Sequence, residues 1–199
     1  MRKSEATERM ILQASLELFV RKGYHGTSID DIMRRVNLSK GALYAHFKSK
    51  SELLFRIIEE YETQFLDELI RSVDAYEGSA LDKLRQIIKF YTSFGDKNME
   101  LSVFLTFLTT ELNADADFQP VLKRTYRRYR SYIADIIQSG ITEGLIRRDV
   151  DPDLAALTFI AIADGTLHQW ILNRDNLDGI QFIRTFQSIF IRGISAEKN

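Results

Sequence analysis

The sequence predicts an all-α protein, with an N-terminal helix-turn-helix domain followed by a larger helical domain. Apolar residues recur at intervals of three and four along almost the whole chain, which is the spacing of amphipathic helices. No segment alternates apolar and polar residues convincingly enough to predict a strand. Only two prolines interrupt the 199 residues, and 45% of the residues are hydrophobic, so the chain can build a substantial core.

The segment 28–47 has the pattern of two short helices joined by a tight turn. Thr27 or Ser28 is suited to cap the first helix, and an aspartate stands three positions after each of them. Asn37 tolerates left-handed backbone angles, so it is suited to end that helix. Ser39 is then a good N-cap for the second.

The second short helix is expected to have an anchored back and a free front. Leu43 and Phe47 share one face and would hold the helix to its domain. The other faces carry the residues Lys40, Gly41, Ala42, Tyr44, Ala45 and His46. This is the geometry of a recognition helix that enters a DNA groove.

Helical spacing and capping residues predict the remaining elements, about nine helices in all. Gly23 and Gly144 are expected to end helices, whereas Asp151 and Asp178 are expected to begin them. Beside the two short helices, the expected ranges are 4–22, 50–75, 79–95, 98–112, 118–143, 152–173 and 179–194. We expect domains at 1–49 for DNA binding and at 50–199 for effector binding and dimerisation.

The last two expected helices have apolar surfaces that another chain is expected to cover. The segment 152–173 is apolar nearly all round, and 179–194 carries two neighbouring apolar stripes. So short a chain can hardly cover both. A second copy that contributes the same two helices would form a four-helix bundle with two-fold symmetry, which predicts a homodimer.

Charge is divided unevenly between the two expected domains. Residues 1–52 contain ten Lys and Arg against six Asp and Glu, a balance of +4, although the whole chain has a net charge of −1. The basic end is therefore the end with the helix-turn-helix pattern, as expected where a protein meets phosphate.

Several classes of protein find no support in the sequence. Cysteine is absent, which excludes disulfides and thiolate sites. Three histidines stand far apart, and no nucleotide-binding or metalloprotease motif occurs, so we expect no enzyme, no cofactor and no metal. No apolar run approaches the roughly 20 residues that span a membrane, and the N-terminus has no apolar signal core. We therefore expect a cytoplasmic protein without a membrane partner.

The first 55 residues or so resemble the DNA-binding domain of the TetR family of bacterial transcriptional regulators. The resemblance is carried by Leu18-Phe19, Gly23-Tyr24, Gly26-Thr27-Ser28, Ile32, Val36 and the run from Leu38 to Leu54, which contains Leu-Ser-Lys-Gly-Ala-Leu-Tyr-Ala-His-Phe. It implies a homodimer that binds a palindromic operator, usually as a repressor that a small molecule releases. The rest of the chain matches the family in its plan only.

The resemblance assigns DNA contacts to matching positions. Lys40 is expected to donate to guanine or phosphate, and Gly41 to let the backbone approach the groove. Ala42 and Ala45 are expected at thymine methyl groups. Phosphate contacts are expected from a further set: Thr27, Ser28, Tyr44, His46 and Lys50. Ser39 at the helix start completes the expected surface.

Aromatic residues concentrate in the expected C-terminal domain, where they would suit an apolar or aromatic effector. The expected lining is Tyr61, Phe65, Phe94, Phe104, Phe107, Tyr126, Tyr129 and His168; Phe90, Tyr91, Glu111 and Asp164 stand nearby in the same helices. The alternative is that these residues form ordinary core. Two other functions stay open: a ligand-independent DNA-binding module that acts through a protein partner, and an activator.

Overall fold

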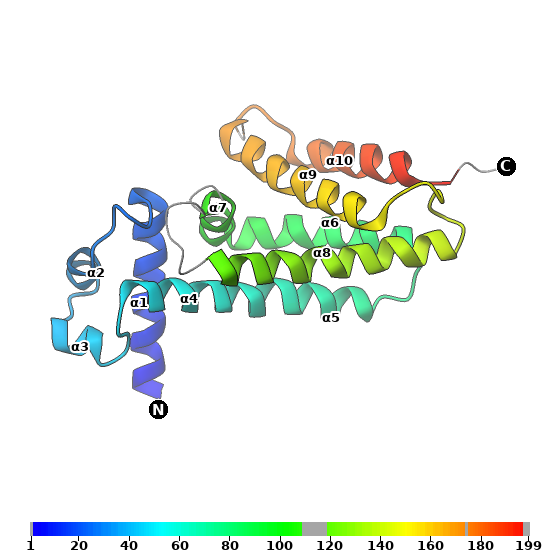
Figure 1. Cartoon of the computed structure of the whole chain (residues 1–199). Helices are drawn as coiled ribbons and strands as arrows, with labels where there is room; N and C mark the ends of the chain where they lie inside the picture. Colours follow the sequence, from blue (N-terminus) through cyan, green and yellow to red (C-terminus); the bar gives the residue numbers. More distant parts are fainter. Residues whose placement is uncertain (1, 109–118, 174, 197–199) are drawn as a thin grey trace. The chain divides into compact units, whose positions relative to one another are not determined.

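The computed structural model describes residues 2–108, 119–173 and 175–196, which fold into helices joined by short connections (Figure 1). No strand forms within these ranges, so the all-α prediction is confirmed. The elements are α1 Arg2–Lys22, α2 Ile29–Val36, α3 Lys40–Tyr44, α4 Lys50–Tyr61, the π-helical segment η1 Glu62–Asp67, α5 Glu68–Asp74, α6 Ala80–Lys97, α7 Met99–Leu108, α8 Gln119–Thr142, α9 Pro152–Asn173 and α10 Gly179–Ile194.

The chain forms two compact units. Unit 1 comprises Met1–Thr63 and Asn98–Lys123, and unit 2 comprises Gln64–Lys97 and Arg124–Asn199. This partition follows packing within each unit. The functional boundary at residue 49 stays a prediction.

The ends of α2 and the start of α3 in the helix-turn-helix coincide with the predicted capping residues. Ser28 caps α2 in a capping box with Asp31, which resolves the choice between Thr27 and Ser28. Asn37 ends α2 in the left-handed conformation, with φ 53°. Ser39 caps α3 by accepting a hydrogen bond from the backbone N–H of Ala42 at 3.3 Å. These signals act over three or four residues, so they could be seen in the sequence.

The core of unit 1 is built around α1. Ile11, Ile32 and Leu43 are fully buried, which fixes α2 and α3 to α1. Helix α7 also packs on α1: the ring of Phe104 stacks on that of Phe19 with centroids 5.7 Å apart. A helix almost a hundred residues along the chain thus completes the unit that carries the helix-turn-helix.

The prediction of one uninterrupted α-helix over 50–75 is wrong in the middle of that range. The helical run is α-helical up to Tyr61, π-helical over Glu62–Asp67 and α-helical again to Asp74. A π-helical turn holds more residues than an α-helical one and so shifts the face that later residues present. The adjacent residues Phe65 and Leu66 are both buried there.

Unit 2 contains α5, α6, α8 from Arg124 onward, α9 and α10, and α9 packs against α6 and α10 (Figure 1). Its centre holds the fully buried side chains of Ile87, Ile133 and Phe159. Gly144 follows the end of α8 with φ 72°, a backbone conformation that residues other than glycine rarely adopt. The predicted ranges of α9 and α10 agree with the structure at both ends.

Helix α9 corrects one expectation. It is long and apolar enough to cross a membrane, by length and composition only, although no apolar run of that length was expected. In unit 2 it behaves as a core helix on one side, where Ala156, Phe159 and Ala163 are buried. The opposite side is exposed, with Leu154 and Leu172 63% and 65% accessible.

Candidate functional site

The exposed face of α3 is the first candidate site. Lys40, Gly41 and Ala45 are exposed, and Tyr44 is 41% accessible although its ring is large and apolar. On the opposite face Leu43 is completely buried and Phe47 nearly so. The buried face fixes the helix and leaves the exposed one available to a partner, as the sequence predicted.

Gly41 has no structural reason to be glycine within its own unit. A Cβ added there meets nothing within 4 Å, and its φ lies outside the positive region that favours glycine. Glycine within a helix costs about 0.5–1 kcal/mol relative to alanine. A residue that destabilises its helix without serving internal packing is expected to serve contact with something outside.

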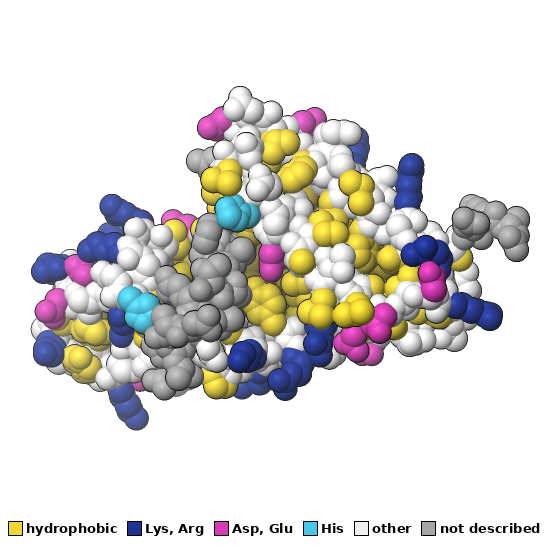
Figure 2. Space-filling model, turned by 45° about the horizontal axis from the view of Figure 1, so that its top comes forward, with side chains coloured by type: hydrophobic (Ala, Val, Ile, Leu, Met, Phe, Trp, Pro, Cys, Tyr) yellow, Lys and Arg dark blue, Asp and Glu magenta, His cyan; other side chains and the backbone are white. Residues whose placement is uncertain are grey.

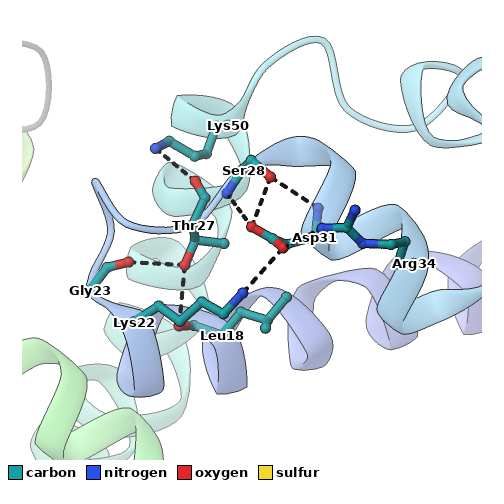
Figure 3. Close-up of polar contacts among 8 residues, drawn as sticks. All are labelled: Leu18, Lys22, Gly23, Thr27, Ser28, Asp31, Arg34 and Lys50. Carbon is teal, nitrogen blue, oxygen red and sulfur yellow. Dashed lines mark hydrogen bonds and ion pairs between the residues drawn. The ribbon is translucent and has the colours of Figure 1, made fainter.

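Thr27 does not fit the expected phosphate contact. Its side chain is only 1% exposed, and its hydroxyl donates within unit 1 to the carbonyls of Gly23 at 2.9 Å and Leu18 at 3.2 Å (Figure 3). The hydroxyl therefore joins the end of α1 to the start of α2. The phosphate-contact prediction for this side chain is corrected to an internal one.

Lys50 is also held inside unit 1. Its ammonium donates to the carbonyls of Tyr24 at 2.8 Å and Thr27 at 3.0 Å, and it lies 4.3 Å from the centre of the Tyr24 ring. Figure 3 shows the side chain reaching back from α4 to the connection between α1 and α2. In this conformation Lys50 is a positioning residue, and spacing alone could not predict a contact across more than twenty residues.

Asp31 organises the start of α2. Its carboxylate accepts hydrogen bonds from the Ser28 hydroxyl and N–H, from Lys22 Nζ at 3.1 Å and from Arg34 Nη2 at 2.6 Å (Figure 3). The bonds from Ser28, followed by those from Lys22 and Arg34, hold the pKa of Asp31 well below its usual range. Ser28 is exposed but already engaged in this network.

His46 lies at the end of the recognition segment and is half-buried. Its Nδ1 lies 3.3 Å from a carboxylate oxygen of Glu8 in α1. This contact fixes the end of α3 to α1. A phosphate contact from His46 would first have to compete with Glu8.

An aromatic cluster in unit 2 is the second candidate site. Phe65 lies at its centre and contacts four rings at centroid distances of 5.0 to 5.8 Å: Phe90, Tyr91, Phe94 and Tyr129. Of the predicted lining, Phe65, Phe94 and Tyr129 therefore come together. They come from η1, α6 and α8, so only the fold brings them into contact.

One carboxylate lies among these rings. Asp164 in α9 accepts a hydrogen bond from the Tyr91 hydroxyl at 3.1 Å and is half-buried. Burial raises the pKa of Asp164 to about 6, and the bond from Tyr91 offsets part of that rise. Burial, and after it the charge of Asp164, raises the pKa of both Tyr126 and Tyr129.

The Tyr129 hydroxyl is buried without a hydrogen-bond partner among the described residues. Leaving a buried hydroxyl unpaired costs about 1–3 kcal/mol. Tyr129 and Asp164 thus bring polar atoms into an aromatic surrounding that does not fully satisfy them. Such an arrangement is typical of a ligand site.

Among the other predicted lining residues, Tyr126 lies on α8 three residues before Tyr129, and the charge of Asp164 acts on both phenols. Phe104 stacks on Phe19 and belongs with Tyr61 to unit 1, so the prediction for Phe104 is corrected to a core role. His168 is exposed on the outer side of α9. Glu111 and the side chain of Phe107 lie outside the described residues. Tyr91 and Asp164 are instead the central polar pair, 73 residues apart.

Two family models match the chain. The model described as bacterial regulatory proteins of the tetR family matches residues 11–57, and that described as the C-terminal domain of BetI-type transcriptional repressors matches residues 80–189. Together they cover the helix-turn-helix, α9 and the larger part of α10.

Similar solved structures span the whole chain. The MbdR regulator from Azoarcus sp. CIB is 28% identical, with a TM-score of 0.84 and coverage of 94% of this chain and 97% of its own. The transcriptional regulator FadR from Bacillus subtilis, in complex with stearoyl-CoA, is 21% identical, with a TM-score of 0.80 and coverage of 94% and 98%. A regulator from Saccharomonospora viridis in complex with choline is 20% identical, with a TM-score of 0.83 and coverage of 97% and 100%.

Proposed function

This chain belongs to the TetR family of bacterial transcriptional regulators, and from that premise we propose that it is a homodimeric repressor in the cytoplasm. It binds a palindromic operator and leaves it when a small apolar or aromatic effector binds. The exposed face of α3 carries this proposal, because the helix is anchored from behind and bears a lysine, a glycine and an exposed tyrosine in front. The role requires no catalytic group.

On the operator, α3 lies in the major groove. Lys40 donates to guanine or phosphate, and Tyr44 donates its hydroxyl to phosphate. Gly41 admits the backbone close to the base edges, and Ala42 and Ala45 contact thymine methyl groups. Few of these side chains can read bases by hydrogen bonds, so part of the specificity comes from the shape and deformability of the DNA.

Selection of bound fragments from genomic DNA tests this role. The wild-type protein enriches a small number of palindromes, whose half-sites are about 34–36 Å apart or a multiple of that distance. Tyr44→Ala loses the enrichment. Tyr76→Ala removes a similarly exposed tyrosine from unit 2 and keeps it. Uniform enrichment, or the same enrichment in all three proteins, contradicts the proposal.

The dimer forms through the exposed sides of α9 and α10. Hydrophobic side chains gather over these two helices in Figure 2. Leu154, Leu157 and Leu172 are exposed along α9, with the small residues Ala161 and Gly165 between them. Helix α10 adds Ile180 and Ile189, which are more than 60% accessible. A second copy covers these side chains and approaches closely where the residues are small.

Sedimentation of charged variants tests the dimer. Leu157→Glu places a charge at the centre of the contact and shifts the protein to monomer without unfolding it, because Leu157 is already exposed in one chain. Leu145→Glu alters an exposed leucine outside α9 and α10 and leaves the dimer intact. A dimer that persists in Leu157→Glu would contradict this contact.

The effector binds at the aromatic cluster of unit 2. Support comes from the rings around Phe65, from the buried hydroxyl of Tyr129 and from the half-buried carboxylate of Asp164. An effector that binds the operator-incompetent conformation more tightly shifts the population toward it, and so releases DNA. A saturating effector therefore lowers operator affinity; unchanged affinity contradicts this mechanism.

A further inference from the structure

The fold leaves the chemistry of the effector undecided. Two similar structures hold ligands of opposite charge, stearoyl-CoA in one and choline in the other, within the same arrangement of helices. Both are little more than 20% identical to this chain. The residues at the aromatic cluster of this chain must therefore decide which class of ligand it accepts.

The decisive group is the Asp164 carboxylate. Tyr91 donates to one of its oxygens, Oδ1, at 3.1 Å. No Lys, Arg or His in the described part of the chain forms an ion pair with it. A carboxylate taken partly out of water is usually paired with a cation, because an unpaired buried charge is strongly unfavourable. Among the described residues, no side chain supplies that cation.

The surroundings of Asp164 also favour a positive ligand. Burial, and after it the charge of Asp164, raises the pKa of Tyr126 and Tyr129, and both are neutral phenols at neutral pH. Phe65 packs edge-on against Tyr91 and Tyr129. The face of an aromatic ring is negative and attracts cations, and it repels anions such as a phosphate or a carboxylate.

A second, independent polar group points to the same site. The Tyr129 hydroxyl is buried and has no partner in the described part of the chain. It can donate to, or accept from, a polar atom of a bound molecule. Asp164, by contrast, is only partly buried.

We propose that the effector is an organic cation, an ammonium ion with apolar substituents, whose charge is held by Asp164 among the rings of Tyr91, Tyr126 and Tyr129. The inference rests on the proposed function, since it names the chemistry of that effector. The apolar substituents contact the phenylalanines around Phe65, and the carboxylate supplies the missing charge pair.

Calorimetric titration of the full chain without DNA tests the site directly. The probes are choline, benzyltrimethylammonium and tetraethylammonium, with two controls: the neutral alcohol in which carbon replaces the nitrogen of choline, and stearoyl-CoA. We expect at least one cation to bind, and choline to bind at least about tenfold more tightly than its neutral counterpart if choline is that cation.

Variants locate the binding. Asp164→Asn keeps the size of the side chain. It lowers the affinity for the cation by about tenfold or more, because it removes the paired charge. Asp135→Asn, at an exposed aspartate of α8, leaves binding unchanged. Tyr129→Phe keeps the ring, removes the unpaired hydroxyl and raises the melting temperature of the ligand-free protein. All three variants are checked by circular dichroism before titration.

Each outcome decides the inference. Failure of every cation to bind, equal binding by Asp164→Asn, or equal binding of the neutral alcohol overturns it. If stearoyl-CoA alone releases the operator, the proposal of a cationic effector is contradicted, whereas the proposed repressor function is still supported. If cations bind in a way that depends on Asp164 but do not change operator affinity, the cation site is supported and its regulatory role is contradicted.

Discussion

Asp31 in unit 1 and Asp164 in unit 2 are both aspartates in helices, and their surroundings differ in a way that separates the two sites. The carboxylate of Asp31 accepts hydrogen bonds from Ser28, Lys22 and Arg34, two of which are three residues away. Asp164 accepts a hydrogen bond from a tyrosine 73 residues away, and it has no cationic partner in the described part of the chain. The Asp31 carboxylate is satisfied by groups of its own unit, whereas the Asp164 carboxylate can still pair with a cation from another molecule.

The comparison extends to the way each unit is anchored. Unit 1 fixes its recognition helix by burying Leu43 and by using Thr27 and Lys50 internally, so that only the front of α3 is free. Unit 2 buries polar atoms whose bonding is incomplete. A rigid surface suits the reading of DNA, and an incompletely satisfied site suits a ligand that changes the protein when it binds.

The largest expected effect comes from breaking the anchor of α3. Leu43→Ala removes a fully buried side chain and lowers the free energy of unfolding by about 2–5 kcal/mol. Tyr44→Ala, at the next residue, changes it by less than about 0.5 kcal/mol because the ring is exposed. Urea denaturation measures both. Equal losses of stability would contradict the assignment of the two faces.

The next effect is on the pH dependence of unit 2. Because the pKa of Asp164 is raised to about 6 in the folded state, the folded protein loses stability as pH rises from about 4 through 6. Asp164→Asn removes that loss, so at pH 7 the variant is more stable, by on the order of 2 kcal/mol. Melting temperatures between pH 4 and 7 test this. Asp31, whose pKa is lowered, loses its stabilising effect only as pH falls below about 4, the range of an ordinary aspartate.

A smaller effect is expected at the cap of α2. Ser28→Ala breaks the capping box with Asp31 and lowers the free energy of unfolding by about 1 kcal/mol. Ser39→Ala at the cap of α3 provides a matched change, since that serine makes a single longer bond of 3.3 Å. Chemical denaturation should rank Ser28→Ala as the more destabilising. The reverse order would contradict the role given to the Asp31 network.

The smallest effect on stability has the opposite sign. Gly41→Ala fills open space in a helix and raises the free energy of unfolding by about 0.5–1 kcal/mol. The added methyl group keeps the backbone from the groove, so operator affinity falls. Gly95→Ala also adds a Cβ that meets nothing within 4 Å and leaves operator affinity unchanged. A Gly41→Ala protein that binds its operator normally would contradict the proposed close approach.

The local part of unit 1 could be predicted from the sequence. Ser28, Asn37 and Ser39 act on groups three or four residues away, so their roles follow from spacing alone. Lys50 and Phe104 could not be predicted, because their partners lie 23 and more residues away and only the fold brings them near. The pairing of Tyr91 with Asp164 could not be predicted for the same reason, although both residues were noted as candidates because of their chemical type.

The most direct test of the central claim is a measurement of operator affinity with and without saturating ligand. It uses fluorescence anisotropy on a palindrome from the fragment selection, with the wild type and Asp164→Asn. We predict that a ligand bound at the aromatic cluster lowers wild-type affinity at least about tenfold, a coupling free energy within the usual range for two linked sites. Asp164→Asn should bind the operator normally and respond only at ligand concentrations about tenfold higher or more. Unchanged wild-type affinity, with calorimetry showing the ligand bound, would contradict the account.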